Sequence, residues 1–365
     1  MPRLGPMRPA LLRQVAIFVA VFVTMELLAV AGEKSFLLTQ VTMSAYYTLV
    51  VLGLSLLMGY AGQISLGQAG FFAVGGYTSA LLTTWDLSAQ RSVGWVAGAA
   101  RVGLLITRTD AFGAQVLTVH PWPALVCALV LTMTVAFVVG IPVLKLKGHY
   151  LAMATLGLGT IVYSIAVGTA RLGAADGISG VPPFPFLPGI GVGGSTGARI
   201  VNYYVACGIL AAVMLLLLNL VHSRVGRALR AIHGAEDAAS AMGVDTPYFK
   251  VRTFVLGAAL AGLAGVFLTH FNGAIGPSEA SIMKSVKYLA IVAVGGMGSL
   301  WGTLAASMVL NFLSLRGYFG TLDDAVFGAI LIVVMLFAPQ GILAIDLRRA
   351  LRLLRPARGA PVDPR

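Results

Sequence analysis

Two short polar stretches in this sequence carry residue types that could serve a function, and neither has the composition of a catalytic centre. The stretch 59–70 holds Gln63, Ser65 and Gln68 among glycines, and the stretch 222–252 holds a short acidic segment beside a run of alanines. Amides, hydroxyls and small side chains can line a path for a solute, whereas an enzyme needs an acid, a base or a nucleophile placed together. No such group converges in the sequence, so movement of a molecule is indicated rather than a reaction on it.

The acidic segment is predicted to form a small amphipathic helix over residues 235–242. Apolar side chains recur at the spacing of one helix face, at Ala235, Ala238, Ala239 and Met242. Glu236 and Asp237 lie in the first turn, where the helix dipole favours negative charge. Gly243 follows the last periodic residue and fits a left-handed cap. A helix this short is unstable in isolation, so its alanine face indicates a partner surface.

Two interpretations of this segment remain open. It is either an ordinary surface loop between two membrane spans, or a coupling helix that docks into another protein on the cytoplasmic side. Arg224, Arg227 and Arg230 are expected to end the preceding span, because cations suit a helix C-terminus and the cytoplasmic face. Thr246 and Pro247 are expected to cap and open the next long helix.

The composition places these stretches in a multi-pass membrane protein. Hydrophobic residues make up 58% of the chain and charged residues only 10%, whereas a soluble domain carries roughly 25% charged residues. The net charge of +12 comes from basic residues in loops, which favours the positive-inside effect over nucleic-acid binding. Cys127 and Cys207 lie within apolar runs, so each is expected to be a buried free thiol outside any disulfide or metal site.

Two further features resemble ligand sites only superficially. His149 has no second His, Asp or Glu nearby in the sequence, so no metal site is expected there. The glycine-rich run 189–197 lacks the Gly-Lys-Ser/Thr ending of a phosphate loop and is expected to be a structured external loop. The sequence therefore predicts no metal, no cofactor and no nucleotide site of its own.

Apolar runs predict an all-α fold of about ten transmembrane or half-membrane helices in a single membrane domain, 1–347. The predicted segments are 11–31, 36–58, 71–83, 121–144, a span that opens at 148, 200–221, 247–271, the two halves of 288–315, and 322–338. The first segment also resembles a signal peptide that could be cleaved after Ala31, but its length of about 20 residues favours an uncleaved span.

The loops between these segments are assigned to the two sides of the membrane. Loop 84–120 is predicted to be an external polar or short-helical region, and 171–199 and the segment through Lys284 are also predicted outside. Loop 222–252, named the coupling loop here, is predicted inside. The arginine-rich tail 348–365 is predicted to be disordered and cytoplasmic, as is the N-terminus.

Glycine interrupts two of the predicted spans, and we name 59–76 the first broken element and 295–302 the second broken element. The second break follows from parity, because an unbroken span over 288–315 would leave the basic tail outside. Backbone that is not helical at membrane depth is tolerated where it lines protein or a watery cavity. Paired breaks in two halves of a chain therefore indicate a midplane path for a solute. For the first element, a tight cytoplasmic turn followed by a tilted helix remains an alternative.

Four stretches resemble the permeases of branched-chain amino acid ABC transporters. The run 57–77, LMGYAGQISLGQAGFFAVGGY, is similar to the most characteristic stretch of that family. The runs 146–157, 223–232 and 290–302 match the LivM-type subunit in particular. These motifs occur in the family's order, and the resemblance covers roughly 36–347.

The resemblance implies one permease half of an importer in the inner membrane of a bacterium. Its expected partners are a second, homologous LivH-like permease, ATP-binding subunits, a periplasmic substrate-binding protein, the small-molecule solute and the lipid bilayer. The coupling loop would contact the ATPase through Arg227, Glu236, Asp237, Ala238, Ala239, Met242 and Gly243. The expected residues of the translocation path are Gly62, Gln63, Ser65, Gly67, Gln68, Gly70, Gly75, Thr155, Gly157, Gly159, Gly295, Gly296 and Gly298.

The chain departs from the family pattern in two places. His233-Gly234 precedes the acidic segment where relatives carry more charge, which could weaken a salt bridge to the ATPase. The insertion 85–120 has no clear counterpart and could alter docking of the binding protein.

The implied mechanism is alternating access, driven by ATP in the partner subunits. A path without acidic residues in its central spans, apart from Glu26 in the first, suits a neutral or zwitterionic solute with an apolar side chain. A related solute such as an amide, urea or an aromatic acid remains an alternative to a branched-chain amino acid. A self-contained secondary carrier would need an intramembrane relay, and Asp323 and Asp324 lie only at a span end. A membrane enzyme is the remaining alternative.

Overall fold

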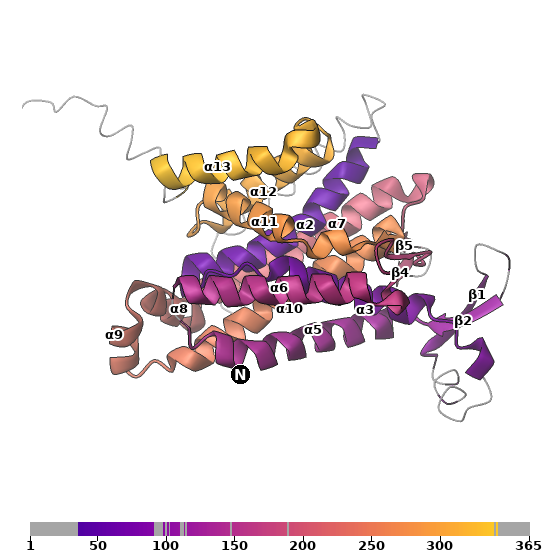
Figure 1. Cartoon of the computed structure of the whole chain (residues 1–365), viewed down its shortest axis with the longest axis horizontal. Coiled ribbons are helices and arrows are strands. Elements are labelled where there is room, and N and C mark those ends of the chain that lie inside the picture. Colours follow the sequence, from indigo (N-terminus) through magenta and orange to yellow (C-terminus); the bar gives the residue numbers. More distant parts are fainter. Residues whose placement is uncertain are drawn as a thin grey trace, which may run out of the picture.

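The computed structural model describes residues 36–338 and 341, apart from 91–97, 99–100, 102, 110–112, 114, 147 and 188–189. The predicted first span 11–31, with Glu26, and the predicted tail 348–365 lie outside the described residues. Within the described part, apolar helices form a bundle to which three two-stranded sheets are attached (Figure 1).

Two long helices, α2 (Phe36–Ala61) and α10 (Thr246–Asn272), form the centre of the bundle. Helix α2 is apolar on every side and buried along nearly its whole length, as expected for a helix surrounded by other helices. It meets α10 where Gly53 faces Gly257: a Cβ atom on Gly53 would lie 3.0 Å from the carbonyl oxygen of Gly257. This approach depends on the missing side chains, as is common where helices pack in lipid.

Further helices pack around this centre. Helices α3 (Gln68–Thr84), α5 (Pro121–Val143) and α7 (Arg199–His222) contact it directly, and α6 (His149–Gly168) and α13 (Asp323–Phe337) lie in an outer layer. Six described helices are long and apolar enough to cross a membrane: α2, α5, α6, α7, α10 and the run Gly320–Phe337, which contains α13. The predicted all-α, multi-pass architecture is therefore confirmed, with α3 as a shorter helix of 17 residues.

The predicted break in 288–315 is confirmed. Helix α11 (Ile282–Gly295) ends at Gly296, whose φ of +88° is a conformation that side chains disfavour, and α12 (Leu300–Leu315) begins after Ser299. The turn between them packs against the end of α2, where the Tyr60 hydroxyl donates to the carbonyl of Gly298 at 2.9 Å. A Cβ atom on Gly59 would collide with the backbone of Met297, so glycine is required at this crossing.

Small sheets gather at the end of the bundle opposite to the coupling loop. Strands β1 (Leu105–Thr109) and β2 (Gln115–Val119) form an antiparallel hairpin in the region expected to be loop or short helix, which corrects that expectation. Each strand holds three β-branched residues, which favour the extended conformation of the hairpin. In Figure 1 this hairpin and the pair β4 (Phe184–Leu187) and β5 (Ile190–Val192) lie far from the coupling loop. The third pair joins β3 (Ile178–Ser179) to β6 (Ala274–Ile275).

The coupling loop contains a separate amphipathic helix, which corrects the expectation that the arginines of 224–230 end the preceding span. Helix α7 ends at His222, and Ser223 then takes an extended backbone conformation. The Ser223 hydroxyl accepts a hydrogen bond from the amide of Val225 at 3.1 Å and so caps a new helix, α8 (Arg224–Gly234).

The next two helix boundaries differ from the prediction by about one residue. Helix α9 (Glu236–Ala241) is followed by Gly243 with φ +84°, so the predicted left-handed residue after this helix is confirmed. The cap of α10 is Asp245 rather than Thr246, because its carboxylate accepts from the amide of Tyr248 at 3.1 Å.

The two cysteines differ in burial. Cys207 is buried, as expected, whereas Cys127 is exposed on α5, which corrects the prediction for that residue. The exposed face of α5 is apolar and includes Val126, Val130 and Val138, so it suits lipid. An apolar run without helical periodicity does not reveal which of its faces is internal.

Candidate functional site

Helices α8 and α9 project together at one end of the bundle (Figure 1). On α9 and the turn after it, Ala238 is exposed and the Met242 side chain is 85% exposed, whereas Ala239 is only 5% exposed because it packs against the chain itself. The apolar face predicted for this segment is therefore divided between the interior and the surface. Met242 and Ala238 are among the exposed apolar residues of this segment that a partner protein could touch.

An ion pair fixes the position of α9 relative to the central helix α10. Lys250 Nζ donates to both carboxylate oxygens of Glu236, at 2.9 and 3.1 Å, and the Lys250 side chain is buried. Lys250 lies in the first turns of α10, so the ion pair joins α9 to a long helix at the centre of the bundle. Asp237 is exposed beside this pair, and Arg227 is exposed on α8.

Helix α8 also touches the first broken element. Gly62 has φ +67°, and a Cβ atom there would lie 3.1 Å from Nδ1 of His233, near the C-terminus of α8. The coupling loop therefore contacts both the central helix and the loop that follows α2.

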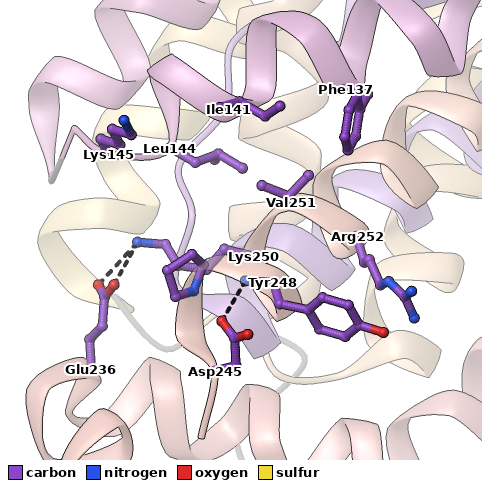
Figure 2. A pocket seen from close by; sticks show the side chains of 11 residues that line it. Phe137, Ile141, Leu144, Lys145, Glu236, Asp245, Tyr248, Lys250, Val251 and Arg252 are labelled. Atoms are coloured by element: carbon purple, nitrogen blue, oxygen red, sulfur yellow. Dashed lines mark hydrogen bonds and ion pairs between the residues drawn. The ribbon is translucent and has the colours of Figure 1, made fainter.

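A groove of about 700 Å³ opens beside the Glu236–Lys250 pair. Figure 2 shows Phe137 and Ile141 of α5 on one side of the groove and Tyr248 and Val251 of α10 on the other. Its lining also includes Leu144, Pro247 and five charged residues, Lys145, Glu236, Asp245, Lys250 and Arg252. An apolar floor with a charged rim can accept an amphipathic segment.

Several residues of the loop 62–67 are buried inside the protein. Gln63 and Gln68 are each 1% exposed, and none of their amide atoms has a hydrogen-bond partner among the described residues. The loop is held from two sides: the amide of Leu66 donates to the Thr155 hydroxyl at 2.9 Å, and Ala69 N donates to the Ser285 hydroxyl of α11 at 3.4 Å. Buried amides without partners are costly, so they suit a path that holds a solute or water.

The glycines of α3 bring it close to two neighbouring helices. On the side facing α6, Cβ atoms at Gly67 and Gly70 would lie 2.9 Å from the Thr155 carbonyl oxygen and 3.1 Å from Gly159 Cα. On the side facing α10, a Cβ atom at Gly75 would lie 2.5 Å from the carbonyl oxygen of Gly262. Close packing explains these glycines directly, and their place on a path stays a prediction.

The other predicted path residues separate into two groups. Ser65 and Gly295 are buried, and Gly295 meets the backbone of Thr303. Gly157 and Gly298 have no described atom within 4 Å of an added Cβ, so close packing does not require glycine at either position, although the Gly298 carbonyl accepts from Tyr60.

A group of partly buried charges was missed by the sequence analysis. Glu279 Oε1 accepts from the Tyr47 hydroxyl at 3.0 Å and pairs with Lys284 Nζ at 3.2 Å, and Lys287 Nζ donates to Asp323 Oδ2 at 2.9 Å. These five residues are named the ionic cluster. Glu279, in the connection between α10 and α11, turns back toward the bundle and reaches Tyr47 near the middle of α2. The external position predicted for the segment through Lys284 stays a prediction.

A signal for this cluster is present in the sequence. Lys284 and Lys287 are three residues apart at the start of an apolar helix, so both fall on one face. Their acidic partners come from other segments, Glu279 from the preceding turn and Asp323 from the next span, and only the fold brings them together.

A bundle of apolar helices with two interrupted elements, buried polar groups and an exposed segment at one end defines a multi-pass membrane protein built for transport. The chain matches the model of the family described as branched-chain amino acid transport system / permease component over residues 36–335. It belongs to that family, as the sequence motifs predicted.

Individual relatives agree with this assignment. The LivM permease of Salmonella typhimurium (strain LT2) is 29% identical over 345 residues, which cover 87% of this chain and 74% of the relative. LivM of Escherichia coli (strain K12) is 28% identical, with 83% of this chain and 68% of the relative covered. LivH of Escherichia coli (strain K12) is 26% identical, with 83% of this chain and 92% of the relative covered. No solved structure matches the chain.

Proposed function

We propose that this chain is the LivM-like permease half of an ABC importer that moves branched-chain amino acids across the inner membrane of a bacterium. Family membership over residues 36–335 carries this proposal. Both LivM and LivH relatives are permease proteins of high-affinity branched-chain amino acid transport systems. A second, homologous permease is accordingly the partner with which this chain would form a complete path.

The proposed orientation places α8, α9 and both chain termini in the cytoplasm and the hairpin β1–β2 outside. This assignment is supported by the arginines of the coupling loop, Arg224, Arg227 and Arg230, which suit the cytoplasmic face. It is also supported by the position of α9 and the hairpin at opposite ends of the bundle (Figure 1). A periplasmic binding protein would then dock on the hairpin side and the ATP-binding subunits on α9.

The proposed coupling acts through two contacts. Docking of an ATPase on Met242 and Ala238 would move α9, and the Glu236–Lys250 ion pair would transmit that movement to α10. The contact of His233 with Gly62 would carry the same movement to the first broken element. Gln63, beside Gly62 on that loop, and Gln68 at the start of α3 would then alternate between the two sides of the membrane.

The first experiment is ATP-driven uptake by proteoliposomes that contain this chain, a LivH-like permease, the ATP-binding subunits and the binding protein. The expected result is uptake of leucine, isoleucine and valine that stops when the ATPase carries an inactivating substitution. Uptake of acetamide, urea or benzoate in place of leucine would select one of the alternative solutes. Leucine uptake by this chain alone, driven by a proton gradient, would contradict the proposal in favour of a secondary carrier.

A further inference from the structure

Two cavities adjoin each other within the bundle, beside the ionic cluster. The larger, of about 300 Å³, is lined by Lys284, Lys287, Asp323 and Tyr288. The smaller, of about 170 Å³, is lined by apolar residues that include Phe72 and Ile275 and by polar residues that include Ser278 and Glu279. Ser278 lines both cavities, so a polar compartment and a partly apolar compartment share a wall.

The ionic cluster lies near the middle of the long helix α2. Tyr47, which bonds to Glu279 and Lys284, is roughly 16 Å from one end of α2 and 21 Å from the other at 1.5 Å per residue. Ionisable side chains at such a depth are costly and mark solute or ion pathways in membrane proteins. A purely mechanical contact between α2 and α11 would be achieved with less cost by apolar side chains.

Several polar atoms around the cavities have unused hydrogen-bonding capacity. Tyr288 is 1% exposed, it lines the larger cavity, and its hydroxyl has no partner among the described residues. Glu279 Oε2 and Asp323 Oδ1 are also buried without a partner in the described part of the chain. Buried polar atoms are nearly always paired in native proteins, so a ligand that both donates and accepts hydrogen bonds fits this set.

We propose that these cavities bind the transported amino acid as a zwitterion, an inference that rests on the proposed function. The carboxylate of the solute accepts from Lys284 and the Tyr288 hydroxyl, and its ammonium group donates to Asp323. The apolar side chain of the solute extends past Ser278 into the smaller cavity. A volume of about 300 Å³ for the larger cavity suits a small solute, since ligand pockets span roughly 300–1,000 Å³.

Charge balance favours a zwitterion over the alternative solutes. Each basic residue of the ionic cluster is already matched by an acidic one, Lys284 by Glu279 and Lys287 by Asp323. A zwitterion brings one charge of each sign, so it can take over contacts of both pairs and leave the cavity neutral. A carboxylic acid without an ammonium group would add an uncompensated negative charge at membrane depth, and an uncharged amide or urea could not replace an ion-pair partner.

The first test removes a single hydroxyl and has a matched control. Tyr288→Phe deletes the unpaired hydroxyl that lines the larger cavity, and Tyr46→Phe deletes another buried, unpaired hydroxyl, from a residue of α2 that does not line it. Neither change removes a hydrogen bond within the described chain. Binding of radiolabelled leucine to the complex in nanodiscs, without the binding protein, is expected to weaken about three- to tenfold in Tyr288→Phe and to stay unchanged in Tyr46→Phe.

The second test removes one ion pair as a unit. The double variant Glu279→Gln/Lys284→Met leaves no unpaired charge behind, so the complex is expected to assemble. Leucine binding is expected to fall about tenfold or more. In the wild-type complex, leucinamide and 4-methyl-2-oxopentanoate, which each carry one of the two charges, are expected to compete about tenfold more weakly than leucine.

The outcomes separate this inference from the proposed function. One outcome would overturn the inference while the proposed function stands. In it, wild-type proteoliposomes take up leucine with ATP, but Tyr288→Phe and the double variant bind leucine as well as the wild type does. The ionic cluster would then have only a structural role. Equal competition by leucinamide or 4-methyl-2-oxopentanoate would also overturn the inference. Absence of ATP-driven leucine uptake in the wild-type complex would instead refute the proposed function.

Discussion

Gly75→Ala is expected to force α3 and α10 apart and to destabilise the bundle. The added Cβ atom would lie 2.5 Å from the carbonyl oxygen and 2.6 Å from Cα of Gly262, where ordinary contacts begin at 3.4 Å, so the helices must separate by about 1 Å. Both obstructing atoms belong to the backbone, which cannot rotate away. Helix α10 is itself backed by α5, because a Cβ atom on Gly262 would meet Thr132 at 3.0 Å.

The magnitude follows from comparison with Gly157→Ala in α6. Both substitutions raise helix propensity by about 0.5–1 kcal/mol, but the Cβ atom at Gly157 meets nothing within 4 Å. The difference between the two variants therefore reports overpacking alone, and we expect Gly75→Ala to be less stable than Gly157→Ala by about 1–3 kcal/mol.

The assay is thermal unfolding of the purified complex in detergent, followed by leucine uptake in proteoliposomes. Gly75→Ala is expected to unfold at a lower temperature than the wild type and to transport more slowly, and Gly157→Ala to match or exceed the wild type in stability. Equal unfolding temperatures for the two variants would refute the reasoning that α3 and α10 are locked together at this glycine.

Two further predictions concern the ends of the bundle. Lys250→Met should leave the complex assembled but lower leucine uptake per ATP hydrolysed severalfold, because Glu236 loses the partner that links α9 to α10. An unchanged ratio of leucine uptake to ATP hydrolysis would show that the ion pair transmits no movement. At the other end, hydrogen bonds from the Ser88 hydroxyl and amide lower the pKa of Asp86 below its ordinary value of 3.8. At pH values above 3.8 the ionised Asp86 carboxylate therefore stabilises the hydrogen bond that it accepts from the Leu117 amide. This stabilisation is lost as the pH falls through the lowered pKa of Asp86. Hydrogen exchange at the Leu117 amide should accelerate relative to its intrinsic rate on acidification in the wild type, and Asp86→Asn should remove that pH dependence.

The sequence predicted the parts of the fold that depend on local composition. Long apolar runs predicted the spans. The parity of the spans predicted a break in 288–315, and the glycines from 295 to 298 located it, since glycine readily adopts a backbone conformation such as that of Gly296. The left-handed residue at Gly243 was predicted for the same reason. These features need no knowledge of what lies across the bundle.

Features that depend on distant segments were not predictable in this way. In the six-residue helix α9, periodicity identified a set of apolar residues but not that Ala239 faces the protein while Met242 faces outward. The ionic cluster joins residues from α2, the turn before α11, α11 itself and α13. A charged residue such as Glu279 in a glycine- and proline-containing connection is usually an external loop residue, and only the turn back into the bundle places it beside Tyr47.

The central claim is that this chain is moved from the cytoplasm through α9, and one measurement tests it most directly. Met242→Glu places a charge on a side chain that is 85% exposed at α9, and Tyr318→Glu places the same charge on a side chain that is 70% exposed in the turn between α12 and α13. In the reconstituted importer, ATP-driven leucine uptake and retention of the ATP-binding subunits are expected to fall strongly in Met242→Glu and to remain at the wild-type level in Tyr318→Glu. Full uptake and full retention in Met242→Glu would contradict the account.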